Sequence, residues 1–193
     1  MGRLIVVAGV PGTGKSLLGS RLARRLGCRF TTVSWIVLEK GLWRAYDPLR
    51  RSFIIDEEGL RREIKRVIEG GCMILETHWL EPLKEVTTTI GKIIVTRTRP
   101  TVLLRRLKRR GWPPRKIAEN VEAEMLGIIA LEAARLLPER VWEVDTTSSP
   151  EESLEKAMEG LAAREARCCI DWLSILGEEE IEELLNYTTR HLG

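Results

Sequence analysis

The sequence predicts an α/β fold of three layers, in which helices cover both faces of a five-stranded parallel sheet. One observation is that short apolar runs alternate with longer segments whose apolar residues have helical spacing, a pattern typical of parallel sheets buried on both faces. The five runs are residues 3–8, 28–33, 72–76, 92–97 and 141–145. The other observation is a glycine-rich turn after the first run, leading from a strand into a helix. Sheets of this kind bind ligands at the carboxyl ends of their strands.

The glycine-rich turn is a phosphate-binding loop, or P-loop. Residues 9–16, GVPGTGKS, match G-x-x-x-x-G-K-[ST] at every fixed position. Glycines allow backbone N–H groups to surround a polyanion, and the following helix adds the positive end of its dipole. In such a loop Lys15 reaches the β- and γ-phosphates of ATP, and the Ser16 hydroxyl binds Mg²⁺. The alternative is a turn with a chance lysine, but the strand before it and the helical pattern after it favour phosphate binding.

Length, charge and cysteine content suggest the class of protein. A chain of 193 residues suits one α/β domain, and no apolar run approaches the roughly 18–20 residues of a membrane span. We therefore expect a soluble cytoplasmic protein without membrane contacts. The net charge of +3 is too small to imply nucleic-acid binding by itself. The cysteines lack C-x-x-C spacing, and we expect reduced thiols in the core. They are Cys28, Cys72, Cys168 and Cys169.

The first half of the chain supplies the candidate metal ligands. We expect a helix at 34–40, an irregular, mobile segment that covers substrate at 41–55, and a helix from the N-cap Asp56 to Glu69. The strand 72–76 then ends in Glu76. In P-loop folds an acid at this place holds hydrated Mg²⁺ opposite the loop lysine. We therefore expect Ser16 and Glu76 to bind the metal.

His78 follows Glu76 by two residues, so the alternation of an extended chain puts both side chains on the same side. Our hypothesis is that His78 orients the water that hydrolyses ATP, or supports the metal shell. The alternative is a histidine that is hydrogen-bonded for structure only.

A basic helix begins at Pro100 and ends at 111–114, GWPP. Its cations are Arg105, Arg106, Lys108, Arg109 and Arg110. Such a helix is either a solvated face or a lid that faces phosphate. The break at GWPP, followed by a new helix, favours the lid. We expect Arg106 and Arg110 to close over the transferred phosphoryl group.

The rest of the chain is predicted to be helical around one last strand. Apolar spacing over 115–136 predicts core positions at Ile117, Val121, Met125, Ile128 and Ile129. A capping box at Ser149 opens a helix that runs to about Leu161. Residues 1–163 form the predicted domain, and 164–193 form an extension of two amphipathic helices packed on it. One face of the extension carries Ile181, Leu184, Leu185 and Thr188. Partner binding or dimerisation by this extension is the alternative.

Several motifs, in this order, resemble those of the adenylate kinase isoenzyme 6 family in its archaeal form. They are GVPGTGKS at 9–16, YD at 46–47, DEE at 56–58, ETH at 76–78, RLKRRGW at 106–112, ENVEAE at 119–124 and VDTT at 144–147. Many folds share the P-loop, whereas the acid-x-His, R-G-W and E-N-x-E-A-E motifs are more discriminating. The family comprises small P-loop proteins placed among the nucleoside monophosphate kinases.

The resemblance implies a nucleoside monophosphate kinase-like P-loop NTPase fold, with a monophosphate-binding segment near 32–55 and a short lid near 109–119. It implies that the P-loop holds ATP largely through main-chain groups and that Arg110 contacts ATP from the lid. The loop residues are Gly12, Gly14, Lys15, Ser16 and Leu17. The implied activities are phosphoryl transfer from ATP to a nucleoside monophosphate such as AMP, with broad specificity, and ATP hydrolysis.

The resemblance also implies a role in maturation of the small ribosomal subunit and its 16S-type rRNA, with transient binding of small-subunit ribosomal protein eleven. One alternative is an assembly factor that is switched by ATP and has negligible kinase activity. Another is a P-loop kinase for a different small metabolite, which the family motifs disfavour.

Two positions depart from the family pattern. The strand-end acid, usually aspartate, is Glu76 here, and one additional methylene alters its metal or water contact. The family run Val-Gly-Asp-Leu is VSWI at 33–36, so an acid near the monophosphate is replaced by Trp35. Trp35 and Trp43 are candidates for stacking on a base, with core or lid packing as the alternative.

Overall fold

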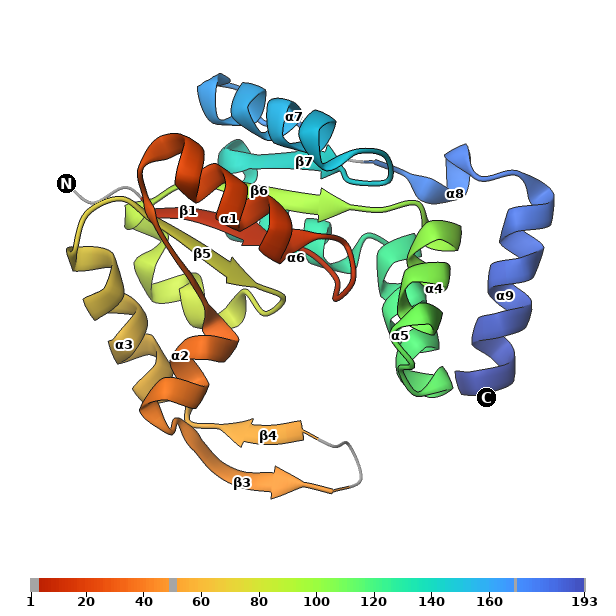
Figure 1. Cartoon of the computed structure of the whole chain (residues 1–193), viewed down its shortest axis with the longest axis horizontal. Coiled ribbons are helices and arrows are strands. Elements are labelled where there is room, and N and C mark those ends of the chain that lie inside the picture. The colour runs from red at the N-terminus through yellow and green to blue at the C-terminus, as the bar shows by residue number, and fades with distance from the viewer. Residues whose placement is uncertain (1–3, 49–51, 169, 193) are drawn as a thin grey trace.

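The computed structural model describes residues 4–48, 52–168 and 170–192. Its central sheet has five parallel strands in the order β2-β5-β1-β6-β7 (Figure 1). The strands are β1 (Leu4–Ala8), β2 (Arg29–Thr32), β5 (Met73–Thr77), β6 (Ile90–Arg97) and β7 (Val141–Asp145). All five predicted strands are confirmed to within two residues at each end. The order places β1, which leads into the P-loop, at the centre of the sheet.

Side chains alternate across the sheet, so β1, β5, β6 and β7 each contribute to two apolar cores, whereas β2 contributes Phe30 to one of them. Leu4 and Val6 face one helical layer, and Ile5 and Val7 face the other. The first layer contains α2 (Val33–Lys40), α3 (Glu57–Glu69), the 3₁₀ segment η1 (Glu81–Thr89) and α6 (Ile128–Leu136). The second contains α1 (Lys15–Leu26) and α7 (Pro150–Ala162). Each fully buried leucine or isoleucine contributes about 1.5–3 kcal/mol to the hydrophobic effect. The predicted three-layer fold is confirmed.

A third apolar cluster lies beyond the carboxyl ends of the strands. It joins Val10 of the P-loop to α4 (Pro100–Arg109), α5 (Pro114–Met125), α8 (Trp172–Ile175) and α9 (Glu178–Leu192). Figure 1 shows α9 running alongside α4 and α5. Helices α8 and α9, which fall within the predicted extension 164–193, pack on this part of the molecule. Leu184 and Thr188 of the predicted apolar face are buried, whereas Leu185 is half-exposed, so its place on that face is wrong.

Residues 41–55 are not irregular, as the sequence suggested, but contain a β-hairpin. Strand β3 (Trp43–Asp47) pairs antiparallel with β4 (Ser52–Ile55), and the hairpin projects away from the sheet (Figure 1). The Phe53 ring contacts Trp43 and Tyr46, with ring centroids 5.4 and 5.3 Å apart. Cross-strand aromatic pairs stabilise such a ribbon. The pairing shifts between Trp43 and Ala45, which removes the regular alternation that identifies a strand.

The predicted helical stretch 115–136 is interrupted. Helix α5 ends at Met125, Gly127 has a left-handed φ of +63°, and α6 begins at Ile128. The interruption changes the direction of the chain, so Ile128 becomes exposed and the prediction that it lies in the core is wrong. Ser149 caps α7 as predicted, because its side chain accepts a hydrogen bond from the Glu152 N–H at 3.1 Å. A short 3₁₀ turn, η2 (Pro138–Arg140), precedes β7.

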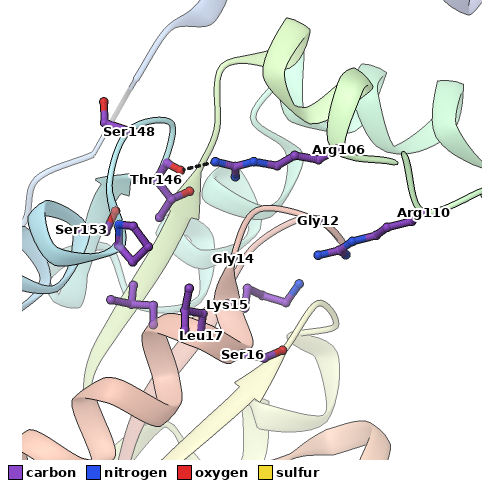
Figure 2. Close-up of a pocket in the computed structure, with 12 residues that line it drawn as sticks. Gly12, Gly14, Lys15, Ser16, Leu17, Arg106, Arg110, Thr146, Ser148 and Ser153 are labelled. Carbon is purple, nitrogen blue, oxygen red and sulfur yellow. Dashed lines mark hydrogen bonds between the residues drawn. The ribbon is translucent and has the colours of Figure 1, made fainter. Parts of the chain in front are cut away.

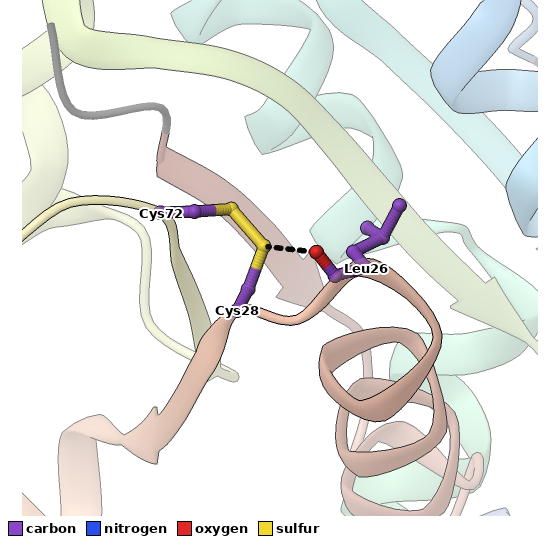
Figure 3. The surroundings of a disulfide bond; sticks show 3 residues. All are labelled: Leu26, Cys28 and Cys72. Atoms are coloured by element: carbon purple, nitrogen blue, oxygen red, sulfur yellow. Dashed lines mark hydrogen bonds between the residues drawn. A yellow bond between two sulfur atoms is a disulfide. The ribbon is translucent and has the colours of Figure 1, made fainter.

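The expectation of reduced core thiols is wrong. Cys28 and Cys72 form a disulfide across 44 residues of sequence (Figure 3). Each cysteine precedes one of two neighbouring strands, and Arg29 is in register with Met73, which brings their Cα atoms to 4.9 Å. Strand order, which cysteine spacing does not encode, creates this pair. Cys168 is exposed, and Cys169 lies outside the described residues. Within the described residues, no helix has both the length and the apolar composition for a membrane span.

Candidate functional site

The P-loop borders a cavity of about 400 Å³ at the carboxyl ends of β1 and β7 (Figure 2). Three elements supply its walls: the loop with the start of α1, the end of α4, and the loop between β7 and α7. The lining residues are Gly12, Gly14, Lys15, Ser16, Leu17, Leu18, Arg106, Arg110, Thr146, Ser148, Pro150 and Ser153. All six residues that the resemblance assigned to ATP are therefore brought together in one cavity.

The loop conformation requires glycine and leaves the helix N-terminus open. Gly12 has φ +97°, and a Cβ atom there would lie 2.7 Å from a methyl carbon of Leu103. Gly14 is the N-cap of α1 and has no side chain to accept from the first N–H groups of the helix. These N–H groups lack intrahelical acceptors. They form a binding site for an anion, with the positive end of the helix dipole behind them.

Lys15 is a buried cation with little compensation. Its side chain is 7% exposed and donates one hydrogen bond, from Nζ to the Val10 carbonyl at 3.1 Å. Within the described residues it forms no ion pair. Burial lowers the pKa of Lys15 to about 8; the charges of Glu76 and Glu124 oppose this shift, and that of Arg110 adds to it. The ammonium group thus retains its proton at pH 7 and has two N–H donors left for phosphate oxygens.

Glu76 lies on the neighbouring strand, opposite Val7 of β1 and Thr32 of β2. Its Oε2 atom is buried and has no hydrogen-bond partner in the described part of the chain. Buried carboxylate oxygens are rarely left without a partner. Mg²⁺ prefers oxygen ligands and keeps several waters. The Ser16 hydroxyl and the Glu76 carboxylate therefore fit a hydrated Mg²⁺ ion.

The two predicted lid arginines lie differently. Arg106 Nη2 donates to the carbonyls of Thr146 at 3.0 Å and Thr147 at 3.2 Å, so it fixes the loop after β7. Arg110 is the C-cap residue of α4, and in Figure 2 it extends towards Lys15. Its guanidinium group makes no hydrogen bond or ion pair with any described residue. Arg110 is thus available to an anion, whereas Arg106 already forms part of a wall.

Sequence reasoning missed a group of buried threonines beneath the loop. Thr13 contacts Thr96, with 2.6 Å between the hydroxyl oxygens, and Thr98 contacts Thr146 at 2.7 Å. The Thr146 hydroxyl also lies 2.7 Å from the Thr13 carbonyl oxygen. These contacts join the P-loop to the ends of β6 and β7. The available signal was the position of Thr96, Thr98 and Thr146 at or just after the carboxyl ends of predicted strands.

The residues after β5 and around α2 form the other side of the site. His78 is exposed and makes no hydrogen bond within the described residues, unlike the structural histidine of the alternative hypothesis. The surrounding chain still desolvates part of the ring, and together with the charges of Lys15 and Lys116 this lowers the pKa of His78, so the ring is neutral at pH 7. Trp35 on α2 is 60% exposed and does not pack in the core. Trp43 packs on Phe53 of the hairpin.

A second group of charges lies behind the cleft and is extensively paired. Arg97 Nε donates to Glu124 Oε1 at 2.9 Å, and Arg97 Nη1 donates to Glu143 Oε2 at 2.6 Å. All three side chains are buried. Trp172 Nε1 and the Thr98 N–H also donate to Glu124 Oε1, at 2.9 and 3.0 Å. Glu124 is the last residue of the ENVEAE motif, and the structure gives that residue a place in this charge cluster.

Residues 5–127 match the protein-family model described as "AAA domain". The chain is also similar to curated archaeal proteins named "putative adenylate kinase". The one from Archaeoglobus fulgidus is 39% identical over 94% of this chain and 98% of its own. The one from Sulfurisphaera tokodaii is 36% identical over 94% and 90%, and the one from Thermococcus kodakarensis is 33% identical over 91% and 96%.

Solved structures with similar folds include kinases. Shikimate kinase from Aquifex aeolicus superposes with a TM-score of 0.57 at 19% identity, covering 82% of this chain and 96% of that one. A gluconokinase from Sinorhizobium meliloti has a TM-score of 0.55 at 20% identity, covering 83% and 91%. At these identities the similarity concerns the fold, which is the α/β P-loop NTPase fold.

Proposed function

We propose, from the premise that this chain belongs to the family of archaeal proteins named putative adenylate kinases, that it is a nucleoside monophosphate kinase. The reaction would transfer the γ-phosphoryl group of ATP to AMP or a similar monophosphate. One observation carries this proposal. Lys15, at the start of α1, is a buried ammonium with spare donors. Glu76, on the strand next to β1, has a buried carboxylate oxygen that finds no partner among the described residues. ATP and Mg²⁺ would satisfy both groups.

The mechanism that follows depends on position and charge. The acceptor phosphate is anionic at neutral pH, so no strong general base is needed. The first N–H groups of α1 and the Lys15 ammonium bind the β- and γ-phosphates. Ser16 and Glu76 would hold Mg²⁺, which would supply positive charge to the phosphates of bound ATP. Arg110, which has no protein partner among the described residues, contacts the transferred group from the lid. Arg106 contributes by holding the loop after β7, which lines the cavity.

ATP hydrolysis is proposed as a side activity that depends on His78. Its lowered pKa leaves the ring neutral, and a neutral imidazole can accept a proton from water. We expect His78→Ala to reduce ATP hydrolysis while transfer to AMP is retained, since the acceptor phosphate needs no base. Unchanged hydrolysis in this variant would refute the role of His78.

A second proposed role is assembly of the small ribosomal subunit, with small-subunit ribosomal protein eleven as partner and ATP as the switch. The order of the family motifs supports it. The hairpin β3–β4 supports it too, because its exposed rings, Trp43, Tyr46 and Phe53, offer a surface for another protein. A pull-down of the purified ribosomal protein, with and without ATP, tests this role. No ATP-dependent difference in capture would contradict it.

The kinase proposal is tested by a coupled assay with ATP, Mg²⁺ and AMP, CMP or UMP in turn. Glu76→Gln is the sharpest variant, because it keeps the shape of the side chain and removes the metal-binding charge. We expect a loss of about 10²-fold in kcat, partly restored by higher Mg²⁺. Glu69→Gln, at an exposed position on α3, should leave turnover unchanged. If calorimetry with Mg²⁺ shows no affinity for ATP or ADP, the kinase and the ATP-switched roles are both wrong.

A further inference from the structure

The segment 164–193 contacts the ATP cavity indirectly, through two sets of hydrogen bonds. None of its described residues lines the cavity. Its helices α8 and α9 instead pack against the lid helices α4 and α5 and against the residues that follow β6. These contacts could stabilise the fold only, or they could also fix the geometry of the cavity at which ATP would bind.

The first set of contacts runs from Trp172 to the P-loop. Trp172 is 3% exposed, and its indole N–H donates to Glu124, which also accepts from the Thr98 backbone N–H. The Thr98 hydroxyl contacts Thr146, whose hydroxyl lies 2.7 Å from the Thr13 carbonyl oxygen. Thr13 precedes the Gly14 N-cap directly. Trp172 thus holds, through buried groups, the backbone that presents the phosphate-binding N–H groups.

The second set runs from Glu180 to the loop after β7. Glu180 Oε1 accepts from Arg99 Nε at 2.8 Å, and Glu180 Oε2 accepts from Arg99 Nη2. The Arg99 backbone N–H donates to the Thr147 hydroxyl at 2.8 Å. The carbonyls of Thr146 and Thr147 in turn accept from Arg106. Glu180 therefore fixes the wall opposite the P-loop.

We propose that Trp172 and Glu180 are positioning residues for ATP: by holding Glu124 and Arg99, they set the distance between the P-loop and the loop 146–148. The inference rests on the proposed function, because it assumes that the cavity binds ATP. Contacts between Glu180 and Thr101 at 3.2 Å and between Glu180 and the Gly177 N–H at 3.2 Å anchor the carboxylate at the start of α9. In the part of the chain that the structure describes, no hydrogen bond of Trp172 or Glu180 leads to α2 or to the hairpin, so binding of the acceptor should be independent of both.

The test uses full-length point variants, because truncation at residue 164 would expose the apolar core around Trp172. Trp172→Phe removes the indole N–H, and Glu180→Gln removes one negative charge. That charge is present at assay pH, because hydrogen bonding by Arg99 lowers the pKa of Glu180 to about 2. Glu183→Gln is the matched control on the exposed side of α9. Trp142→Phe is the control for the indole, since Trp142 donates to the Lys156 carbonyl at 3.1 Å, away from both sets of contacts.

Affinity for ATP is measured by calorimetry, and KM for AMP and kcat at saturating ATP by the coupled assay, at a temperature where every variant is folded. We expect the Kd for ATP to rise about threefold to tenfold in Trp172→Phe and Glu180→Gln. In these two variants, KM for AMP and kcat should stay within about twofold of the wild-type values. In both control variants, the Kd for ATP should stay within the same range. A merely structural role would lower the melting temperature and leave the Kd for ATP of the folded protein unchanged.

A double-mutant cycle with Thr147→Val isolates the second set of contacts. If Glu180 acts through Arg99 and Thr147, the losses in ATP affinity for Glu180→Gln and Thr147→Val are not additive. The proposal is overturned if Glu180→Gln binds ATP like Glu183→Gln, if the two losses simply add, or if affinity for AMP falls in parallel. A wild-type protein that binds no ATP would overturn the proposed function as well, whereas unaffected variants of an ATP-binding protein overturn only this inference.

Discussion

The P-loop cleft and the cluster of Arg97, Glu124 and Glu143 both bury charged groups, but within the described residues only the cluster joins its charges in ion pairs. In the cluster, one guanidinium joins two carboxylates, and Trp172 and the Thr98 N–H add further donors. In the cleft, Lys15 has a single carbonyl acceptor and Glu76 Oε2 has no partner among the described residues. On the proposed function, the unpaired buried charge lies where a ligand would bind, and the paired buried charge lies where elements of the fold are joined.

This difference has a thermodynamic meaning. Taking a charge out of water costs several kcal/mol, which only close pairing can offset. The cluster meets that cost within the folded chain, so its charges are needed for stability. In the cleft, protein groups offset only part of the desolvation cost of the buried charges. A bound ligand of the right charge would offset the rest, which adds to its affinity. Substitutions in the two regions should therefore have opposite consequences.

The largest effect is expected for Arg97→Met. Two buried carboxylates would lose their counter-charge, and the free energy of unfolding should fall by about 3–5 kcal/mol. Burial raises the pKa of Glu124 and Arg97 opposes that shift, so in the variant the Glu124 pKa should rise further and the loss should be smaller at pH 5 than at pH 7. Urea denaturation of the wild type and the variant at both pH values measures the difference in the free energy of unfolding.

Arg61 provides the matched control, because it also joins two carboxylates, Glu57 and Glu85, but at the surface. Arg61→Met should cost less than about 1 kcal/mol. Equal losses for Arg61→Met and Arg97→Met would contradict the distinction between the buried cluster and an ordinary ion pair.

The next effect concerns catalysis rather than stability. Lys15→Met should lower kcat by about 10²–10³-fold, because the ammonium contacts the charge that develops on the phosphates. The melting temperature should be unchanged or higher, since a buried cation without an ion-pair partner has been removed. The coupled assay measures the loss in kcat, and a thermal melt of the same sample measures the melting temperature.

Lys65→Met removes an exposed lysine that pairs with Glu85 and should leave activity and melting temperature almost unchanged. A clear fall in the melting temperature of Lys15→Met would show that Lys15 stabilises the fold, as the charges of the Arg97 cluster do. The contrast between the two regions would then fail.

The smallest effect is a pH dependence of ATP binding. The pKa of Lys15 is lowered to about 8 by burial, and a bound triphosphate favours the protonated form. Affinity should therefore be highest below pH 8 and fall by about tenfold per pH unit well above it, with uptake of about half a proton or more at pH 8.5. Calorimetry of Mg²⁺-ATP binding in buffers of different ionisation enthalpy detects this proton. Binding heats that do not depend on the buffer at pH 8.5 would show that Lys15 is already charged there.

Much of the fold and part of the site could be predicted from the chain. The five strands and the loop around Lys15 follow from local patterns, because strand burial and P-loop spacing are properties of consecutive residues. The hairpin at 43–55 escaped prediction, since a shifted pairing removed its alternation. The break at Gly127 escaped as well, because apolar spacing continued across it.

The sequence by itself determined where the strands lie, that a phosphate-binding loop follows the first of them, and that an acid ends the third. Only the tertiary structure decided which charges meet: that Arg106 binds the loop after β7 while Arg110 faces the P-loop, that Cys28 joins Cys72, and that Arg97 lies between two glutamates. The physical reason is that periodicity records which face of an element is apolar. Pairing between elements depends on strand order and packing, which join residues that lie 27, 44 or 46 positions apart along the chain.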